Sequence, residues 1–269
     1  MDLVVTRTPD GWASHRGETA VGKAAALVRP DARCFVLFGA CHHDAYRPLV
    51  QTIARQLRRD LYTEIDEADT EVLQRLVGSG FVINRREHTY AIPIDPTSTG
   101  LTNLAVPAGF ELLTADQVDE DRLRELDDEL KQDVPGADGW KWDRQGFRKE
   151  THDAPDFDPV TYLVAIEQAT GRYAGLVRAW NRPDSPRLGL IGIGRGYRRR
   201  GLARVLLAQV LASLHQRGQS DVVAEVDVTN TGSNRLLTSL GARRTGGIIE
   251  LIRPWSAASP ADNQPDRDR

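Results

Sequence analysis

The chain has 269 residues, a length that suits one large domain or two smaller ones. Charged residues make up 27% and hydrophobic residues 40%, a globular composition that excludes a wholly disordered or fibrous chain. The 35 Lys and Arg against 38 Asp and Glu leave a formal net charge of −3, which argues against the broad basic surface of a nucleic-acid-binding protein.

The mean hydropathy is −0.42 and no run of 18 apolar residues occurs, so we expect no transmembrane helix and no membrane partner. The first residues show no basic segment followed by an apolar one, so we expect no secretory signal. Cys34 and Cys41 are too few for a disulfide scaffold. These observations favour a reduced, cytoplasmic protein.

Loop-forming residues divide the chain. Pro, Gly, Ser and Thr are concentrated between Pro93 and Gly109, and the end of the chain is rich in Pro, Asp, Ala and Ser without an apolar pattern. We therefore predict an N-terminal domain over 1–95, a linker over 96–107, a second domain over 108–255 and a disordered tail over 256–269.

The N-terminal domain shows alternating strand and helix patterns. The expected strands are 34–38, 61–65 and 90–94, and the expected helices are 46–57 and 70–77. The second domain opens with a capping-box pattern, Thr114 with Gln117, before a helix whose stripe includes Leu123, Leu126 and Leu130.

The rest of the second domain alternates in the same way. The expected strands are 162–166, 173–180, 188–193, 221–228 and 248–252, and the expected helices run from about Arg199 to Gly218 and from 231 to 240. This order predicts an α/β (α+β) fold with a mixed sheet and helices on its faces. Because the N-terminal order matches that of 188–252, we predict two divergent copies of one fold.

The segment from Ile191 to Ala203 carries the clearest chemical signal. A predicted strand ends at Ile193, and a predicted helix begins a few residues later, near Arg199. The first turn of a helix has unpaired backbone N–H groups and a positive dipole end, so it can bind an anion. Gly201 lets a phosphate group approach that backbone, and nearby arginines add charge-assisted hydrogen bonds. This pattern predicts a diphosphate site.

Two common phosphate motifs do not fit. The third position of G-x-G-x-x-G is Tyr197, and G-x-x-x-x-G-K-[ST] does not occur. The motif R-x-x-G-x-A does fit, at Arg198, Gly201 and Ala203, and it resembles the coenzyme A loop of the GNAT superfamily of N-acetyltransferases. The segment from Asn230 to Ala242 resembles that family's N-x-x-[AS]-x-x-L-[YL]-x-x-x-G-[FA] pattern.

This resemblance implies tandem GNAT-like folds, each a mixed, mostly antiparallel sheet splayed in the middle, with helices on both faces. It implies acetyl-CoA as co-substrate, its pantetheine arm paired to the strand before the loop and its diphosphate held by the loop. The residues that it assigns to the cofactor are Ile191, Ile193, Arg198, Arg199, Arg200, Gly201, Leu202, Ala203 and Asn230. For Asn230, a helix N-cap remains an equal alternative.

The chain departs from the family pattern at the expected proton-transfer positions. Leu237 stands where many members have a tyrosine that protonates the departing thiolate, and the strand 188–193 contains no glutamate. Glu225 and Asp227, on one face of the next strand, are the candidate catalytic bases, although each can also face solvent or pair with arginine. The hydroxyls that can replace the tyrosine, unless they are capping or surface groups, belong to Ser233, Thr238 and Ser239.

The N-terminal copy lacks the R-x-x-G-x-A loop, so we expect it to be degenerate. Cys41, His42, His43 and Asp44 stand at the corresponding place, but four adjacent residues rarely converge on one ion, so we predict no metal. In the other copy, nine acids between Asp116 and Asp133 favour a cationic acceptor, unless they form a solvated helix face.

The sequence therefore predicts an acyl-CoA-dependent N-acyltransferase that moves acetyl to a primary amine of a small molecule or peptide. A non-catalytic acyl-CoA-binding or regulatory module is the alternative, because Leu237 and the missing strand glutamate weaken the case for catalysis. Binding of nucleic acid through the arginines between Arg195 and Arg204 is disfavoured by the net charge of −3.

Overall fold

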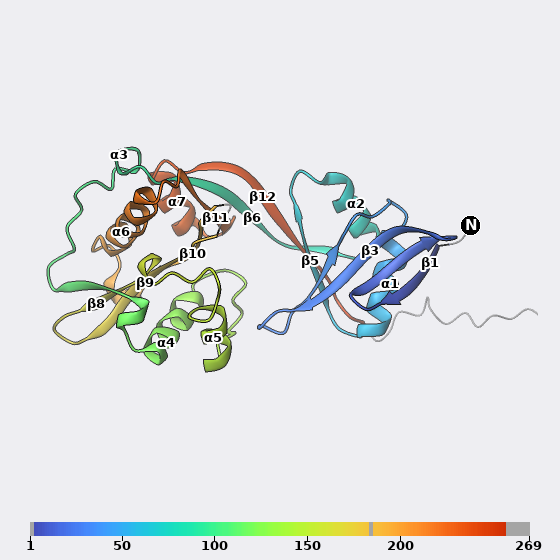
Figure 1. The fold of residues 1–269 in the computed structure, drawn as a ribbon, viewed down its shortest axis with the longest axis horizontal. Helices are drawn as coiled ribbons and strands as arrows, with labels where there is room; N and C mark the ends of the chain where they lie inside the picture. The colour runs from blue at the N-terminus through green and yellow to red at the C-terminus, as the bar shows by residue number, and fades with distance from the viewer. Residues whose placement is uncertain (1–2, 183–184, 257–269) are drawn as a thin grey trace, which may run out of the picture. The chain divides into compact units, whose positions relative to one another are not determined.

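The computed structural model describes residues 3–182 and 185–256, and its ribbon is drawn in Figure 1. The chain forms two compact units, one of residues 1–85 and 249–269 and one of residues 86–248. These limits differ from the predicted divisions at 95 and 108, which stay predictions about independent domains. All but the first residue of the predicted tail, 256–269, lies outside the described residues.

The first unit is built on an antiparallel run of strands followed by a parallel crossover. Strands β1 to β4 pair in sequence, and β4 then pairs in parallel with β5. Its elements are β1 (Leu3–Thr8), β2 (Gly11–Arg16), β3 (Thr19–Val28), β4 (Cys34–Phe38), α1 (Tyr46–Leu57), β5 (Leu61–Asp66) and α2 (Thr70–Gly78). Helix α1 packs because Leu49, Ile53 and Leu57 follow helical spacing, and α1 and α2 share one apolar cluster with the sheet.

The second unit repeats this order of strands. Strands β7 to β10 are antiparallel, and β10 pairs in parallel with β11. Its elements are α3 (Pro96–Thr99), β7 (Phe110–Thr114), α4 (Glu120–Lys131), α5 (Arg144–Glu150), β8 (Tyr162–Glu167), β9 (Arg172–Trp180), β10 (Arg187–Ile193), α6 (Leu202–Gln216), β11 (Asp221–Asp227) and α7 (Thr231–Ser239). Helices α6 and α7 cover one face of this sheet, and α4 and α5 cover the other.

Two strands, β6 (Val82–Pro93) and β12 (Arg243–Arg253), contribute residues to both units. In the first unit β12 is the neighbour of β5 in the strand order. In the second unit β6 pairs antiparallel with β11 over seven residue pairs, from Asp221 with Pro93 to Asp227 with Glu87. Strand β6, which follows the elements of the first unit in the chain, thus completes the second unit, and β12, which follows the elements of the second unit, completes the first.

Strands β10 and β11 diverge shortly after they meet. They pair only at Arg187 with Val223 and at Leu188 with Ala224, whereas β10 stays paired with β9 as far as Ile193. The opening between β10 and β11 exposes one backbone edge of β10 beyond Leu188. The predicted splayed mixed sheet is confirmed in this unit. In the first unit, β4 and β5 likewise pair at two positions only.

Several sequence expectations required correction. The strands β1 to β3 and the first half of β6 were not predicted, because short alternating stretches with Gly, Thr and Lys give a weak strand pattern. The predicted linker contains α3, and its Leu101 is buried. Helix α6 begins at Leu202 rather than near Arg199, since Arg199 and Gly201 have positive φ and cannot continue a helix.

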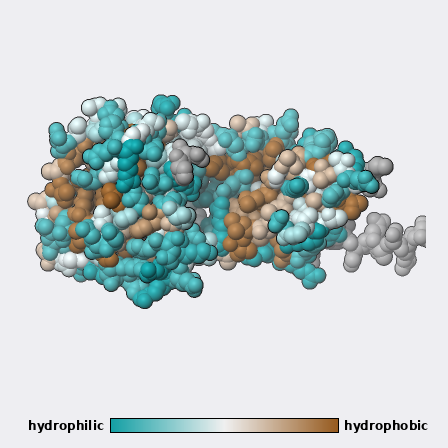
Figure 2. Space-filling view, viewed as in Figure 1, coloured by the Kyte–Doolittle hydropathy of each residue, from teal (hydrophilic) through white to brown (hydrophobic). Residues whose placement is uncertain are grey.

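The surface in view is mostly polar: Figure 2 shows hydrophilic residues over much of it, with smaller hydrophobic patches between them. Leu27 and Leu37 are among the exposed large hydrophobic residues of the first unit. None of the helices within the described residues is long and apolar enough to cross a membrane.

Candidate active site

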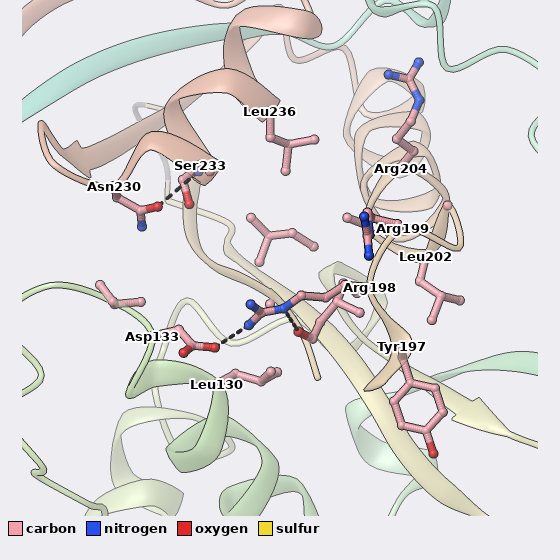
Figure 3. Close-up of a pocket in the computed structure, with 17 residues that line it drawn as sticks. Leu130, Asp133, Tyr197, Arg198, Arg199, Leu202, Arg204, Asn230, Ser233 and Leu236 are labelled. Atoms are coloured by element: carbon pink, nitrogen blue, oxygen red, sulfur yellow. Dashed lines mark hydrogen bonds and ion pairs between the residues drawn. The ribbon is translucent and has the colours of Figure 1, made fainter. Parts of the chain in front are cut away.

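A cavity of about 610 Å³ lies in the second unit where β10 separates from β11 (Figure 3). We call it the β10–α6 cavity. Its walls come from the end of α4, the edge of β10, the loop into α6, and the first turns of α6 and α7. The lining residues are Leu130, Asp133, Val134, Ile191–Ile193, Tyr197–Arg199, Gly201–Arg204, Asn230, Gly232, Ser233 and Leu236.

The loop between β10 and α6 presents backbone N–H groups to this cavity. Arg199 has φ +62° and Gly201 φ +86°, a left-handed conformation that glycine adopts readily and valine does not. A Cβ atom built on Gly201 meets no atom within 4 Å, so the space beside this backbone is open. Across the described residues, the N–H groups of 199–204 have no hydrogen-bond acceptor, as is usual at the start of a helix. A loop of this geometry can accommodate an anion, and we call residues 199–204 the cradle.

The structure brings together eight of the nine residues that the sequence assigned to the cofactor. Ile191, Ile193, Arg198, Arg199, Gly201, Leu202, Ala203 and Asn230 all line the cavity. Arg200 does not line it: its guanidinium donates to the Gly196 carbonyl oxygen at 3.2 Å and lies 5.6 Å from the Tyr197 ring.

The sequence did not identify the wall opposite the loop. Leu130, Asp133 and Val134 lie some 60 residues before the motif, and no spacing connects them with it. Gly192 permits the close approach of this wall, because a Cβ atom there would lie 2.9 Å from the Cβ of Leu130. Leu236 was predictable in principle, since Ser233 and Leu236 share a helix face at i and i+3.

Asn230 fulfils the capping role that the sequence left open. Its Oδ1 accepts a hydrogen bond from the Ser233 N–H at 3.1 Å and so caps α7. Asn230 also lines the cavity, and Figure 3 shows its side chain beside that of Ser233. The capping geometry therefore leaves Asn230 available to a ligand.

The three candidate hydroxyls on α7 lie in different environments. Thr238 donates to the Asn234 carbonyl oxygen at 2.8 Å and Ser239 to that of Leu236 at 2.7 Å. Both hydroxyls thus satisfy the backbone of their own helix. Ser233 lines the cavity. Leu237 is 1% exposed and packs in the apolar cluster beneath α7.

Neither candidate base lines the β10–α6 cavity. The Glu225 carboxylate accepts a hydrogen bond from Arg187, one of the two residues of β10 that pair with β11. Asp227 is 6% exposed, and its Oδ1 accepts from the Thr229 N–H at 2.8 Å and the Thr229 hydroxyl at 2.5 Å. Asp227 therefore fixes the turn after β11, whereas the half-buried Glu225 carboxylate lies at the point of divergence.

The acidic helix α4 is largely neutralised by the chain itself. Asp127 is fully buried and accepts from Arg178 Nη1 at 2.8 Å and from Trp142 Nε1 at 3.2 Å. The Tyr162 hydroxyl lies 3.4 Å from the same carboxylate, and burial followed by the charge of Asp127 raises the pKa of Tyr162 well above its usual value. Lys131 lies 4.1 Å from the Trp140 ring. The two tryptophans therefore pack against α4, and fewer acids remain to attract a cationic acceptor.

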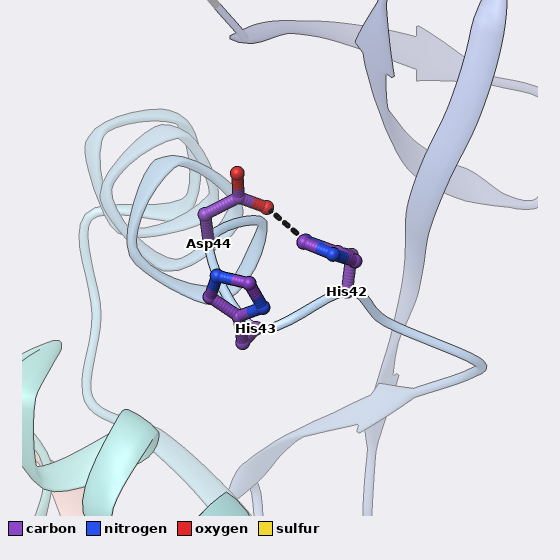
Figure 4. Close-up of side chains that lie close together, drawn as sticks. All are labelled: His42, His43 and Asp44. Atoms are coloured by element: carbon purple, nitrogen blue, oxygen red, sulfur yellow. Dashed lines mark hydrogen bonds and ion pairs between the residues drawn. The ribbon is translucent and has the colours of Figure 1, made fainter.

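In the first unit, His42, His43 and Asp44 lie together in the loop between β4 and α1 (Figure 4). Their possible ligand atoms lie within 4.8 Å of one another. His42 Nδ1 is 2.6 Å from Asp44 Oδ1, and Arg16 also binds this carboxylate. These contacts lower the pKa of Asp44, chiefly through the hydrogen bond from His42. A metal ion at this place would compete with the Arg16 cation for the Asp44 carboxylate. That the protein binds no metal stays a prediction.

Comparison with known proteins bears on the second unit most directly. The profile of the Acetyltransferase (GNAT) family matches residues 121–242. No curated protein gives a significant match.

Solved structures share the fold over almost the whole chain. A GCN5-related N-acetyltransferase from Sphaerobacter thermophilus has 20% identity and a TM-score of 0.71 over 93% of this chain and 82% of its own. A tandem GNAT protein from the clavulanic acid biosynthesis pathway has 15% identity and a TM-score of 0.65 over 92% and 83%. A GCN5-related N-acetyltransferase from Kribbella flavida has 14% identity and a TM-score of 0.61 over 94% and 90%.

Proposed function

We propose that the chain, whose residues 121–242 match the Acetyltransferase (GNAT) family, is a GNAT acetyltransferase that transfers acetyl from acetyl-CoA to a primary amine of a small molecule or peptide. The β10–α6 cavity is the acyl-CoA site of this proposal. The observation that carries it is the cradle at 199–204, whose N–H groups have no acceptor among the described residues and whose loop has open space at Gly201 and two positive φ angles.

The residues present fit acetyl-CoA. The diphosphate would take hydrogen bonds from the cradle, and Arg198 and Arg199 would add charge. The pantetheine arm would pair with the β10 edge that β11 leaves free between Leu188 and Ile193. Asn230 and Ser233 would lie along the same arm.

The reaction requires two proton movements. The neutral amine nitrogen attacks the thioester carbonyl carbon, the carbon–sulfur bond breaks, the new amide nitrogen loses a proton and the thiolate gains one. We assign removal of the amine proton to Glu225 rather than Asp227, because the Asp227 carboxylate is committed to Thr229. The hydrogen bond from Arg187 fixes the orientation of the Glu225 carboxylate. We assign protonation of the thiolate to the Ser233 hydroxyl, because Ser233 lines the cavity.

We also propose that the first unit is a degenerate copy of the second. Both units have four antiparallel strands, a parallel crossover and strands that diverge after two residue pairs. In the first unit the corresponding loop packs onto β3, where His42 N–H donates to the Val21 carbonyl oxygen at 2.7 Å. A Cβ atom on Gly22 would lie 3.1 Å from Cys41 Sγ, so this loop leaves no open cradle.

The alternative is an acyl-CoA-binding or regulatory module without catalysis. It is favoured by the buried Leu237 and by the absence of both candidate bases from the cavity walls. In either case the free cysteines Cys34 and Cys41 suit a reducing compartment, and we place the protein in the cytoplasm.

One experiment separates these functions. The full chain is incubated with acetyl-CoA and a panel of amines while free thiol release is measured. Saturable release that depends on the amine supports the transferase. Acetyl-CoA binding without amine-dependent release supports the module, and no binding at all refutes both.

A further inference from the structure

An ion pair spans the β10–α6 cavity from one wall to the other. Asp133, just after α4, accepts a hydrogen bond from Arg198 of the loop, and Figure 3 shows the two side chains meeting there. Arg195 donates to the other carboxylate oxygen of Asp133 at 2.9 Å. Asp133 and Arg198 both line the cavity, so this contact occupies part of the space that the proposed function gives to acyl-CoA.

Arg198 also occupies the free edge of β10. Its Nε donates to the Ile193 carbonyl oxygen at 3.0 Å. Ile193 lies beyond the last pairing of β10 with β11, so its carbonyl belongs to the edge available to the pantetheine arm. A ligand that pairs with this edge and an Arg198 side chain lying along it exclude each other.

We propose that Asp133 is a residue of the acyl-CoA site that controls access: it holds Arg198 across the cavity, and acyl-CoA binds by exchanging the carboxylate for its diphosphate. This inference rests on the proposed function. It adds a residue that controls access to the site and that lies outside both the R-x-x-G-x-A motif and the loop that forms the cradle.

The charges around Asp133 make such an exchange feasible. The hydrogen bond from Arg195, followed by that from Arg198, lowers the pKa of Asp133, so the carboxylate is ionised near neutral pH and repels a diphosphate. Arg195 can keep its contact when Arg198 leaves, because its side chain is 83% exposed and belongs to the 3₁₀ turn Arg195–Tyr197 that precedes Arg198. Asp133 therefore does not lose all its compensating charge when Arg198 turns to the ligand.

The expected effect of Asp133→Asn is tighter binding. The substitution weakens the hold on Arg198 and removes a negative charge from the cavity wall, so the Kd for acetyl-CoA should fall about 3- to 10-fold by calorimetry on the full chain. In an Arg198→Ala background the same substitution should change the Kd less than twofold, because most of the effect passes through Arg198.

Glu129→Gln is the matched control. Glu129 lies one helical turn before Asp133; among the described residues no ion pair includes its carboxylate, whose charge acts on Arg195 without direct contact. If the charge of α4 alone opposed the diphosphate, Glu129→Gln would tighten binding as much as Asp133→Asn, and this outcome would overturn the proposal.

The remaining outcomes are also decisive. Unchanged or weaker acetyl-CoA binding by a folded Asp133→Asn variant, with normal binding by the wild type, means that Asp133 does not restrain Arg198 and overturns the inference alone. If neither the wild type nor the variant binds acetyl-CoA, both this inference and the proposed function are overturned. Binding by the variant and not by the wild type supports the inference.

Discussion

Gly201 offers the sharpest test of the cradle, because its backbone conformation and the open space beside it make separate contributions. At φ +86°, a valine costs about 1–2 kcal/mol of backbone strain. The variant either bears this strain or rotates to negative φ, which turns the amides of Gly201 and Leu202 away from the cavity. A branched side chain that keeps the loop conformation points into space where no atom lies within 4 Å and where the diphosphate would bind.

Both responses weaken the binding of acetyl-CoA while the chain stays folded. Charge-assisted hydrogen bonds contribute roughly 1.5–3 kcal/mol each, so losing two of them should raise the Kd for acetyl-CoA by about 100-fold or more. The melting temperature should fall by about 2–8 °C, which leaves the chain folded at assay temperature. Calorimetry with acetyl-CoA on Gly201→Val measures the first quantity and thermal unfolding measures the second.

Gly196 provides the matched control in the same loop. It has no positive φ, and a Cβ atom there also meets nothing within 4 Å, yet it does not line the cavity. Gly196→Val should therefore leave the Kd within about threefold of the wild type. If a folded Gly201→Val variant bound acetyl-CoA with unchanged affinity, the diphosphate would not lie in the cradle.

Four other outcomes are expected. Glu225→Gln should lower kcat about 10²-fold with little change in acetyl-CoA affinity, and the loss should shrink as the pH nears the pKa of the amine; a larger loss in Asp227→Asn would move the base to that residue. Asp127→Asn leaves the buried Arg178 without its charged partner at 2.8 Å, so urea unfolding should show a loss of about 3 kcal/mol, and a loss below 1 kcal/mol would contradict a buried pair. Carbon-13 NMR should give the Asp95 carboxyl a pKa of about 2, lowered chiefly by the hydrogen bond from the Thr97 hydroxyl. The resulting stability is present above the pKa of the unfolded chain and is lost as the pH falls through about 2. A titration midpoint near about 4 would exclude this helix cap. Titration with acetyl-CoA should give one site per chain, whereas two equivalent sites would refute the degenerate first copy.

The second unit was largely predictable from its sequence because its signals are local. The residues Leu202, Leu206, Val210 and Leu214 of α6 follow helical spacing and are all 0 to 1% exposed. The capping box of Thr114 and Gln117 forms as expected, although it opens a short 3₁₀ turn and α4 takes Asp119 as its own cap. The position of each element followed from spacing within that element.

The partners of each strand could not be predicted in the same way. The pattern of β6 indicates a strand near Tyr90 and that of β12 indicates one near Ile249, but neither says which unit the strand completes. Residues 249–253 belong to the first compact unit and residues 87–93 pair with β11, whereas the predicted division at 95 follows the order of the chain alone. Such pairing depends on contacts over long sequence separation, which periodicity does not encode.

The cavity wall formed by Asp133 has a related explanation. Nine acids between Asp116 and Asp133 suggested a field that attracts a cationic acceptor, but the effect of each acid depends on its neighbours in space. Asp127 is neutralised from β9 by Arg178, and Asp133 from the loop by Arg195 and Arg198. Ion pairs between residues 50 to 65 positions apart convert an apparent acidic face into internal contacts.

The positions of Leu237, Ser233 and Glu225 bear on how the acyl transfer would be accelerated. A buried leucine cannot protonate a thiolate, and a serine hydroxyl is a weak acid, so protonation by the enzyme can lower the barrier only modestly. The Glu225 carboxylate accepts a hydrogen bond from Arg187 and must share its oxygens between this arginine and an incoming amine proton. Alignment of a neutral amine with the thioester, however, can itself supply roughly 7–11 kcal/mol. The rate should then depend more on the groups that fix both substrates along β10 than on any single proton-transfer residue.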